Sequence, residues 1–333
     1  MNVDQISNHI QKFLDVLMCP RCGGEFSIIS KSLVCGSCNS SYLIVNGIPR
    51  FVENDAYVES FSLEWLTFPT TQLARKIGEA YQIMDFELRT GLAVKNPPAI
   101  ALEAGCGAGR HTELLARHGW RLISVDLSKA VESAYENVKD YDNVLVIQAD
   151  LNSLPLKAQA FDVVFSLGVL HHTPNPFNTF RSIKTHLKLG GSLSVSVYSD
   201  EGILIKLRNR IGDVYRWFGK RLKHESLLKL DTSFLNIFKL PEKYYTPPLD
   251  INLQDRQPGW KPKLTLANIF AILVPPLSFA PDLDWRILDT FDYLTPTYAS
   301  YHTYSEVTEW FKREGFSLIE NLRIPVSVKG ILT

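Results

Sequence analysis

The stretch that decides the fold is AIALEAGCGAGR, residues 99–110, in which a short apolar run leads into three alternating glycines. Gly105, Gly107 and Gly109 follow Glu103 in the pattern ExGxGxG. A backbone that turns sharply from a strand into a helix while touching a ligand needs residues without a Cβ atom, and glycine meets both demands at little cost. The stretch therefore predicts a nucleotide-binding turn between a strand and a helix.

Two further apolar runs that end in aspartate extend this pattern. Residues 121–125 lead to Asp126, and residues 144–149 lead to Asp150. An acidic residue at the end of the strand after the glycine loop is placed to accept hydrogen bonds from ribose hydroxyls. Each aspartate also has a structural explanation, because Asp126 could cap the next helix and Asp150 could belong to an ordinary turn.

In order and spacing, these segments resemble the class I S-adenosylmethionine-dependent methyltransferases. The resemblance runs over residues 98–198, through FDVVFSLGVLHHTPNP (161–176) and LKLGGSLSVSVY (187–198), and returns at residues 304–329. A nicotinamide-binding domain would share the first strand and the acidic second strand, but not the later segments. The resemblance implies an α/β fold: a doubly wound, Rossmann-like, seven-stranded and mostly parallel sheet with an antiparallel last strand.

The resemblance also implies the cofactor, S-adenosylmethionine, and the residues that bind it. The glycine loop surrounds the methionine moiety, Asp126 binds the ribose, and Asp150 with Leu151 holds the adenine. Cys106, inside the loop, is interpreted as small and buried rather than catalytic. The expected cofactor-binding residues are Glu103, Gly105, Gly107, Gly109, Asp126, Leu127, Asp150, Leu151, Ser166, Leu167 and Gly168.

Four of the five cysteines form two Cys-x-x-Cys pairs, Cys19 with Cys22 and Cys35 with Cys38. Two such knuckles bring four thiolates into a tetrahedron that suits zinc, and the metal is expected to be structural because no coordination position stays open. Redox disulfides or unrelated thiols are the alternatives. The continuation SSYLIVNGIPRFV (residues 40–52) resembles the small zinc-ribbon proteins that act as methyltransferase activators. We expect the sheet to fold independently of this ribbon.

The chain is expected to divide into five parts. These are a zinc ribbon (1–52), a helical connector or lid (53–97), the cofactor-binding core (98–199), a helical, apolar cap insertion (200–285), and the closing helix and strands (286–333). Two interpretations are open for the segment from Phe61 to Trp65: it lies over the cofactor as a lid, or it only packs onto the sheet. Basic and acidic residues number 35 each, so no global field favours polyanions. The amino terminus lacks a secretion signal, which favours a cytoplasmic location.

Candidate acceptor contacts follow the predicted strands. His171 and His172 fall just beyond the carboxyl edge, where His172 could act as a general base. The alternative is that both only begin the next helix. An aromatic and acidic loop with Asp289, Phe291 and Asp292 adds Tyr293, Tyr298 and His302, so the candidate catalytic residues are His172, Tyr293 and His302.

The insertion offers candidate partners. Residues 203–230 are apolar and basic, which suits anionic lipid, a phosphorylated substrate or RNA, or else a solvated face of a packed cap. Residues 264–285 are apolar but broken by prolines, so they are too short to span a bilayer. They could line a substrate tunnel, rest on a membrane surface or form cap core, and residues 203–280 are therefore a candidate for peripheral membrane contact.

These observations together predict an S-adenosylmethionine-dependent methyltransferase with a small-molecule or lipid-like acceptor. Methylation of an rRNA or tRNA base is the alternative, supported by the ribbon and the basic helix. A non-enzymatic scaffold is disfavoured, because Glu103, the three glycines, Asp126 and Asp150 are all present.

Overall fold

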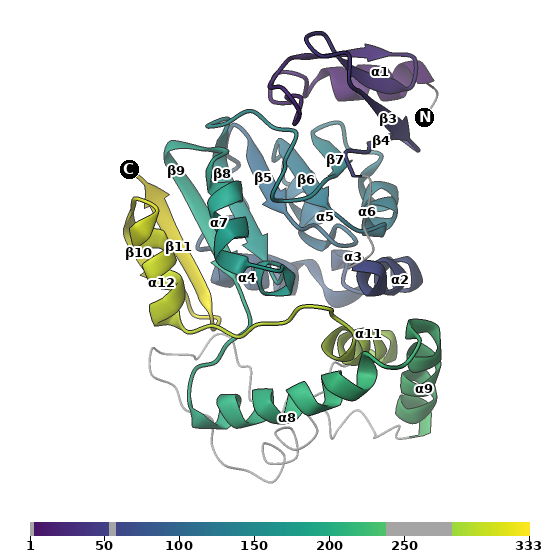
Figure 1. Ribbon diagram of the computed structural model, residues 1–333, viewed down its shortest axis with the longest axis vertical. Coiled ribbons are helices and arrows are strands. Elements are labelled where there is room, and N and C mark those ends of the chain that lie inside the picture. The colour runs from purple at the N-terminus through teal and green to yellow at the C-terminus, as the bar shows by residue number, and fades with distance from the viewer. Residues whose placement is uncertain (1–2, 53–57, 238–281) are drawn as a thin grey trace.

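The computed structural model describes residues 3–52, 58–237 and 282–333 (Figure 1). Its centre is a seven-stranded sheet in the order β10-β11-β9-β8-β5-β6-β7. The apolar stretch expected over residues 264–285 lies outside the described residues as far as residue 281. The seven strands are β5 (Ala101–Ala104), β6 (Leu122–Asp126), β7 (Val144–Gln148), β8 (Phe161–Leu167), β9 (Leu187–Ser196), β10 (Phe316–Asn321) and β11 (Ser327–Leu332).

The predicted fold class is confirmed by the strand pairing. Strands β5 to β9 pair in parallel, whereas β11 runs antiparallel to both β9 and β10. Every residue of β5 and β7 is buried, as expected for strands covered on both faces. The helices around the sheet are α4 (Glu79–Thr90), α5 (Arg110–Arg117), α6 (Ala130–Val138), α7 (Pro176–Lys184) and α12 (Tyr304–Arg313).

Two hydrophobic clusters cover the two faces of the sheet. Leu102 and Ile147 face the cluster that includes α7 and α12, whereas their neighbours Ala101 and Val146 face the cluster of α4, α5 and α6. This division follows from the two-residue period of a strand, which points successive side chains to opposite faces. Because β5, β6 and β8 run parallel, their carboxyl ends lie at one edge of the sheet, where the glycine loop lies.

The amino-terminal ribbon is a four-stranded antiparallel sheet preceded by a helix. Its elements are α1 (Val3–Gln11), β1 (Phe26–Ile29), β2 (Ser32–Cys35), β3 (Ser41–Val45) and β4 (Ile48–Pro49). Ile10, Phe13 and Leu33 from this region belong to the same buried cluster as Leu102 and Ile147. The expectation of an independent ribbon is therefore wrong, because part of the sheet's core consists of ribbon side chains.

The ribbon also lies along the edge strand β7. His9 Nε2 lies 2.7 Å from the carbonyl oxygen of Val144, at the start of β7. At its end, the backbone N–H of Phe51 donates to the carbonyl of Gln148 over 2.8 Å. The guanidinium of Arg50 bonds the Gln148 side chain at 2.9 Å and forms an ion pair with Glu132 of α6. These contacts join the ribbon to the core by backbone as well as side chains.

The connector holds α2 (Glu59–Thr67) and α3 (Ala74–Ile77) ahead of α4. Helix α4 is followed by Gly91, whose left-handed conformation ends the helix. Gly78, which has a φ of 91°, separates α3 from α4.

The cap consists of α8 (Ile203–Gly219), α9 (His224–Ile237) and α11 (Leu283–Leu294). Helix α8 packs on α11 through Gly212 and Gly219, where a Cβ atom would clash with the Tyr293 side chain and the Leu294 backbone. The residues around 289–294, expected in a loop, belong to α11, and this helix crosses the predicted boundary at residue 285. Among the described residues, no helix combines the length and apolarity needed to cross a membrane.

Candidate active site

The glycine loop between β5 and α5 has the conformation that its sequence predicts. Gly105, Gly107 and Gly109 have φ values of 92°, 51° and 82°, a region that other residues rarely adopt. A Cβ atom on Gly105 would lie 2.3 Å from the Val169 side chain, and one on Gly109 would lie 3.1 Å from the backbone of Ala134. The loop therefore needs glycine for both conformation and space.

Hydrogen bonds of Glu103 and Asp126 stabilise the glycine loop and the segments next to it. Oε2 of Glu103 accepts hydrogen bonds from the hydroxyls of Thr112 (2.6 Å) and Ser124 (2.9 Å), and burial raises the pKa of this carboxyl to about 7. Oδ2 of Asp126 accepts from the N–H of Gly107 (2.9 Å), and Oδ1 accepts from the N–H and hydroxyl of Ser128. Burial raises the pKa of Asp126, while these hydrogen bonds oppose the shift. Helix α6 has Lys129 rather than Asp126 as its N-cap, so Asp126 stabilises the glycine loop and the turn at Ser128, and its ribose contact stays a prediction.

The other expected cofactor-binding residues line the same edge of the sheet. Oδ1 of Asp150 accepts from the backbone and the side chain of Asn152, as in an ordinary turn. The Ser166 hydroxyl donates to the carbonyl of Ala104 and joins β8 to β5. Leu127 and Leu151 are buried, Leu167 ends β8, and Gly168 follows it with a φ of 79°. Cys106 is buried, and burial raises the pKa of its thiol, which disfavours a nucleophilic role.

Helix α2 covers the glycine loop. The N–H of Lys129 donates to the Ser62 hydroxyl (3.0 Å), and the Ser133 hydroxyl donates to the carbonyl of Trp65 (2.8 Å). A Cβ atom on Gly107 would lie 3.3 Å from the Trp65 ring. The segment from Phe61 to Trp65 therefore lies over the loop, in the position that the lid interpretation requires.

A buried polar cluster lies next to this lid. It consists of Glu64 on α2, His171 and His172 in the 3-10 turn after β8, Tyr198 after β9, and Asp292 on α11. The ring of His172 is 5.1 Å from Phe61, and the ring of His171 stacks on Tyr198 at 3.7 Å. The Tyr198 hydroxyl donates to Oδ2 of Asp292 over 3.3 Å. Four separate segments thus bring titratable groups to one place.

The position of Glu64 follows from the period of helix α2. Phe61 contacts His172, and Phe68 packs with Ile287 and Leu288 of α11. Residues three and four apart share a helix face, so Glu64 faces the space between His172 and α11. Asp292 lies one turn beyond Leu288 on the facing helix, so the two carboxyl groups approach this space from opposite sides.

Several buried atoms of the cluster have no hydrogen-bond partner among the described residues. They include both carboxylate oxygens of Glu64, Oδ1 of Asp292 and Nε2 of His171. Glu64 is fully buried, and this burial together with the nearby charge of Asp292 raises its pKa well above the usual value. Buried polar groups are ordinarily satisfied, so such a concentration of unpartnered atoms indicates a ligand site.

His172 has the geometry of a general base. Its Nδ1 lies 2.9 Å from the carbonyl oxygen of Tyr298, so this nitrogen carries the proton and Nε2 carries the lone pair. Burial lowers the pKa of His172, which keeps the ring neutral near pH 7. His171 differs, because its Nδ1 accepts the N–H of Tyr198 and its Nε2 is fully enclosed.

The structure does not bring Tyr293 and His302 next to His172. Tyr293 packs between α8 and α11, with the guanidinium groups of Arg208 and Arg216 each 5.1 Å from its ring. Both ring nitrogens of His302 are engaged, Nδ1 by Glu306 and Nε2 by Ser300, each at 2.8 Å. Their acceptor contacts stay a prediction. Sequence reasoning missed Glu64, although an acid within the apolar face formed by Phe61 and Phe68 was a readable signal.

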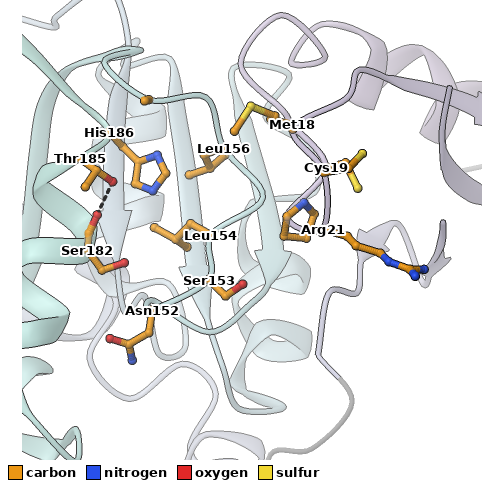
Figure 2. A pocket seen from close by; sticks show the side chains of 14 residues that line it. Met18, Cys19, Arg21, Asn152, Ser153, Leu154, Leu156, Ser182, Thr185 and His186 are labelled. Atoms are coloured by element: carbon orange, nitrogen blue, oxygen red, sulfur yellow. Dashed lines mark hydrogen bonds between the residues drawn. The ribbon is translucent and has the colours of Figure 1, made fainter. Parts of the chain in front are cut away.

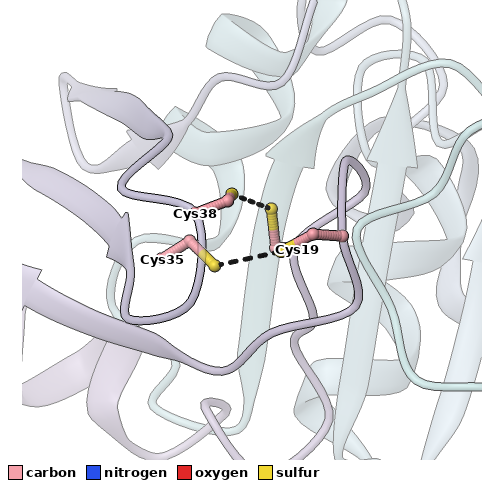
Figure 3. Close-up of side chains that lie close together, drawn as sticks. Cys19, Cys35 and Cys38 are labelled. Carbon is pink, nitrogen blue, oxygen red and sulfur yellow. Dashed lines mark hydrogen bonds between the residues drawn. The ribbon is translucent and has the colours of Figure 1, made fainter.

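The four cysteines of the ribbon converge as predicted (Figure 3). Their Sγ atoms all lie within 4.8 Å of one another, and the Cys19–Cys38 and Cys22–Cys35 sulfur distances are 3.7 and 3.4 Å. Four sulfurs about 2.3 Å from one ion stand nearly this far apart. The donor set fits zinc, and all four cysteines are free thiols rather than disulfides.

A groove of 380 Å³ separates the first cysteine knuckle from the loop after β7 (Figure 2). Its polar lining is satisfied within the protein: the Thr185 hydroxyl donates to the Ser182 carbonyl, and the Ser182 hydroxyl donates to Leu151. None of the unpartnered buried atoms in the described part of the chain lies in this lining. We assign the groove no ligand.

Comparison with known proteins agrees with this architecture. A family model described as a methyltransferase domain matches residues 102–195, and a model described as Trm112p-like protein matches residues 11–47. The chain thus contains a class I, S-adenosylmethionine-dependent methyltransferase domain behind a Trm112-like zinc-ribbon region with a four-cysteine cluster. S-adenosylmethionine is the cofactor that this domain implies.

The curated relatives include the tRNA U34 carboxymethyltransferases of Pseudoalteromonas translucida and Shewanella frigidimarina. The first is 30% identical over 105 residues, covering 30% of this chain and 32% of the relative. The second is 29% identical over 126 residues, covering 35% and 38%. The chain therefore spans about a third of the length of these relatives.

Solved structures with similarity include a complex of the Haloferax volcanii Trm112 methyltransferase activator with a methyltransferase. That match has 21% identity and a TM-score of 0.36, and it covers 43% of this chain and 62% of the other. A methyltransferase from Mesorhizobium loti that depends on S-adenosylmethionine matches with 27% identity and a TM-score of 0.31, covering 34% and 51%.

Proposed function

We propose that the chain transfers a methyl group from S-adenosylmethionine to a small or lipid-like acceptor held by the buried polar cluster. The observation that carries this proposal is the fully buried carboxyl of Glu64, which lacks a partner among the described residues. The charge of Asp126, which bonds the glycine loop, contributes to the raised pKa of Glu64, so an acceptor at Glu64 would lie near the cofactor. Unpartnered carboxyl oxygens accept hydrogen bonds, which suits an acceptor with hydroxyl or amine groups.

Methyl transfer needs alignment, exclusion of water and a place for one proton. S-adenosylmethionine supplies an electrophilic methyl group when bound, and the glycine loop, Asp126 and Asp150 would hold it. Glu64 and Asp292 would orient the acceptor. Nε2 of His172 would take the acceptor's proton as the bond from the acceptor to the methyl carbon forms and the carbon–sulfur bond breaks. The lowered pKa of His172 keeps this nitrogen free.

RNA is the second candidate acceptor, and the comparisons favour it over the small acceptor that the sequence analysis puts first. The curated relatives are named as tRNA-modifying enzymes, and a Trm112-like region precedes the domain. However, the match to the methyltransferase domain ends at residue 195, so it does not include the cap helices α8 and α11.

Methyl incorporation distinguishes the two acceptors. The purified chain would be incubated with S-adenosylmethionine carrying a labelled methyl group, together with total RNA, a lipid extract or a metabolite extract. We expect label in the lipid or metabolite fraction, and none there with His172→Ala. If label appears only in RNA, and His172→Ala abolishes that labelling, RNA would replace the small or lipid-like molecule as the proposed acceptor.

Cofactor binding is tested separately from the acceptor. Asp126→Ala should weaken the binding of S-adenosylmethionine by about 1.5–3 kcal/mol, the scale of hydrogen bonds to a charged group. Calorimetry measures this loss, and Asp142→Ala serves as a control because Asp142 lies on the surface, where it pairs with Lys12. Equal affinity for wild type and the Asp126 variant would contradict the ribose contact.

Zinc is the metal that we propose for the ribbon. Elemental analysis should find one zinc per chain, and Cys35→Ser should release it because the tetrahedral set loses a ligand. Since Leu33 and Phe13 share the core with the sheet, the same variant should lower the melting temperature of the whole protein. An iron cluster or no metal would contradict the zinc assignment.

A further inference from the structure

Helix α8 has two opposite faces. The buried residues Asn209, Gly212, Arg216 and Gly219 form the face that packs on the rest of the protein. A second set recurs at steps of four and three residues, and at about 100° per residue it lies roughly opposite the first. We call this set the outward face of α8: Ile203, Leu207, Arg210, Val214, Trp217, Phe218 and Arg221.

The outward face exposes an unusual amount of large apolar surface. The exposed fractions are 82% for Ile203, 60% for Phe218, 57% for Val214, 52% for Trp217 and 50% for Leu207. Single exposed apolar residues are ordinary, but a contiguous stripe marks an interaction surface. The 17-residue helix runs along the end of the molecule opposite the ribbon, and its stripe is about 25 Å long (Figure 1).

The charges on and beside this face are positive. Lys206, Arg210 and Lys223 are exposed, and none has an ion-pair partner within the described ranges. The Arg221 guanidinium lies 3.3 Å from the centre of the Trp217 ring. Asp213 is the single acid in α8, where it pairs with Arg216 and accepts a hydrogen bond from the Tyr301 hydroxyl. A cationic rim around an apolar stripe complements an anionic lipid surface.

We propose that the outward face of α8 docks on an anionic membrane surface. The apolar side chains would enter the boundary between headgroups and acyl chains, and the cations would pair with lipid phosphates. RNA suits this face less well, because the aliphatic side chains of Ile203, Leu207 and Val214 offer nothing to phosphates or base edges. This inference stands apart from the identity of the methyl acceptor.

Vesicle binding tests the apolar part of the proposal. The full chain should co-sediment with vesicles of phosphatidylcholine and phosphatidylglycerol, and Trp217→Ala/Phe218→Ala should reduce the partition coefficient at least about tenfold. The matched control Leu189→Ala/Leu318→Ala removes two leucines that are equally exposed on other elements, and it should bind as the wild type does. Equal loss in both double variants would overturn the proposal, as would failure of the wild type to bind.

Charge reversal tests the electrostatic part and the RNA alternative. Lys206→Glu/Arg210→Glu/Lys223→Glu should abolish binding to the anionic vesicles, whereas Lys31→Glu/Lys76→Glu/Lys95→Glu, with the same change in net charge, should retain most of it. Binding should also fall when phosphatidylglycerol is omitted. Wild-type protein that ignores vesicles but binds RNA through these three cations would overturn the membrane assignment.

Discussion

Two buried carboxyl groups, Asp85 and Glu64, lie on different helices of the connector and in opposite electrostatic situations. Asp85 on α4 bonds Arg89 at 2.9 Å and Arg110, the first residue of α5, at 2.6 Å. Burial alone would raise its pKa, but the two guanidinium groups outweigh burial and hold the pKa well below its usual value. Glu64 on α2 has neither a cation nor a donor within the described part of the chain, and its pKa is raised.

This difference separates a structural role from a ligand-binding one. The Asp85 pairs fix α4 against the start of α5 and thus support the glycine loop. An unpartnered acid such as Glu64 costs stability, and proteins retain such groups where a ligand completes them. On the proposed function, the protein stabilises the cofactor loop within its own fold, and a ligand would complete the acceptor side.

The largest expected effect on stability comes from removing the charge of Asp85, the carboxyl group that has partners. Asp85→Asn should lower the free energy of unfolding by about 3–4 kcal/mol, because two partly buried guanidinium groups lose their counter-charge. Urea unfolding measures the loss, with Asp142→Asn as a control expected to cost at most about 1 kcal/mol, as for exposed pairs. Similar losses in the two variants would remove the distinction between a structural acid and a surface one.

The next largest expected effect on stability comes from a substitution in the glycine loop. Gly105→Ala should cost about 2–3 kcal/mol, since it adds strain at a positive φ and a clash with Val169. Gly190→Ala is the control, because Gly190 has a φ of 78° with open space around it. It should cost only about 1–2 kcal/mol. Val169→Ala combined with Gly105→Ala should recover part of the loss, and no recovery would show that crowding is not the cause.

The smallest expected effect has the opposite sign. Glu64→Gln should raise the free energy of unfolding by about 1–2 kcal/mol at pH 7, because the buried carboxyl holds a proton in the folded protein that it releases in the unfolded chain, a cost that a neutral amide avoids. The same variant should lose methyl transfer while its calorimetric affinity for S-adenosylmethionine changes little. A loss of stability together with unchanged activity would show that Glu64 has a structural role like that of Asp85.

The two carboxyls should also give stability opposite dependences on pH. The folded pKa of Asp85 is lowered, so its contribution is complete above the unfolded value of about 3.9 and is lost as pH falls below it. The folded pKa of Glu64 is raised, so stability falls as pH rises from about 4.3 towards that folded pKa. Glu64→Gln should remove the share of the second dependence that Glu64 contributes and leave the share of Glu103, whose pKa is also raised, and urea titrations across this range would detect the difference.

Much of the fold could be predicted because its signals are local. The glycines, the strands that end in Asp126 and Asp150, and the two cysteine pairs each lie within a few residues, and each makes a backbone or metal-ligand demand that few other residues meet. The structure confirms the predicted seven-stranded sheet with its antiparallel β11 and the predicted cluster of four cysteine sulfurs.

The acceptor side could not be predicted in the same way, because four separate segments build it. The sequence places Glu64 on the same face of a helix as Phe61 and Phe68, but only the fold shows that this face meets His172 and α11. In the sequence analysis, Asp292 and Tyr293 are expected in one loop, and Tyr293 is named as a candidate acceptor contact. In helix α11, adjacent side chains diverge by about 100°, so Asp292 meets Tyr198 while Tyr293 turns towards α8.

The ribbon contacts with β7 also bear on how the chain avoids self-association. An outermost strand with unpaired N–H and C=O groups is a template for pairing with another molecule. Here, His9 and Phe51 engage the carbonyl oxygens at the two ends of that strand, and Arg50 is fixed beside it by Glu132. Because the ribbon belongs to the same chain, it covers this edge strand at any protein concentration.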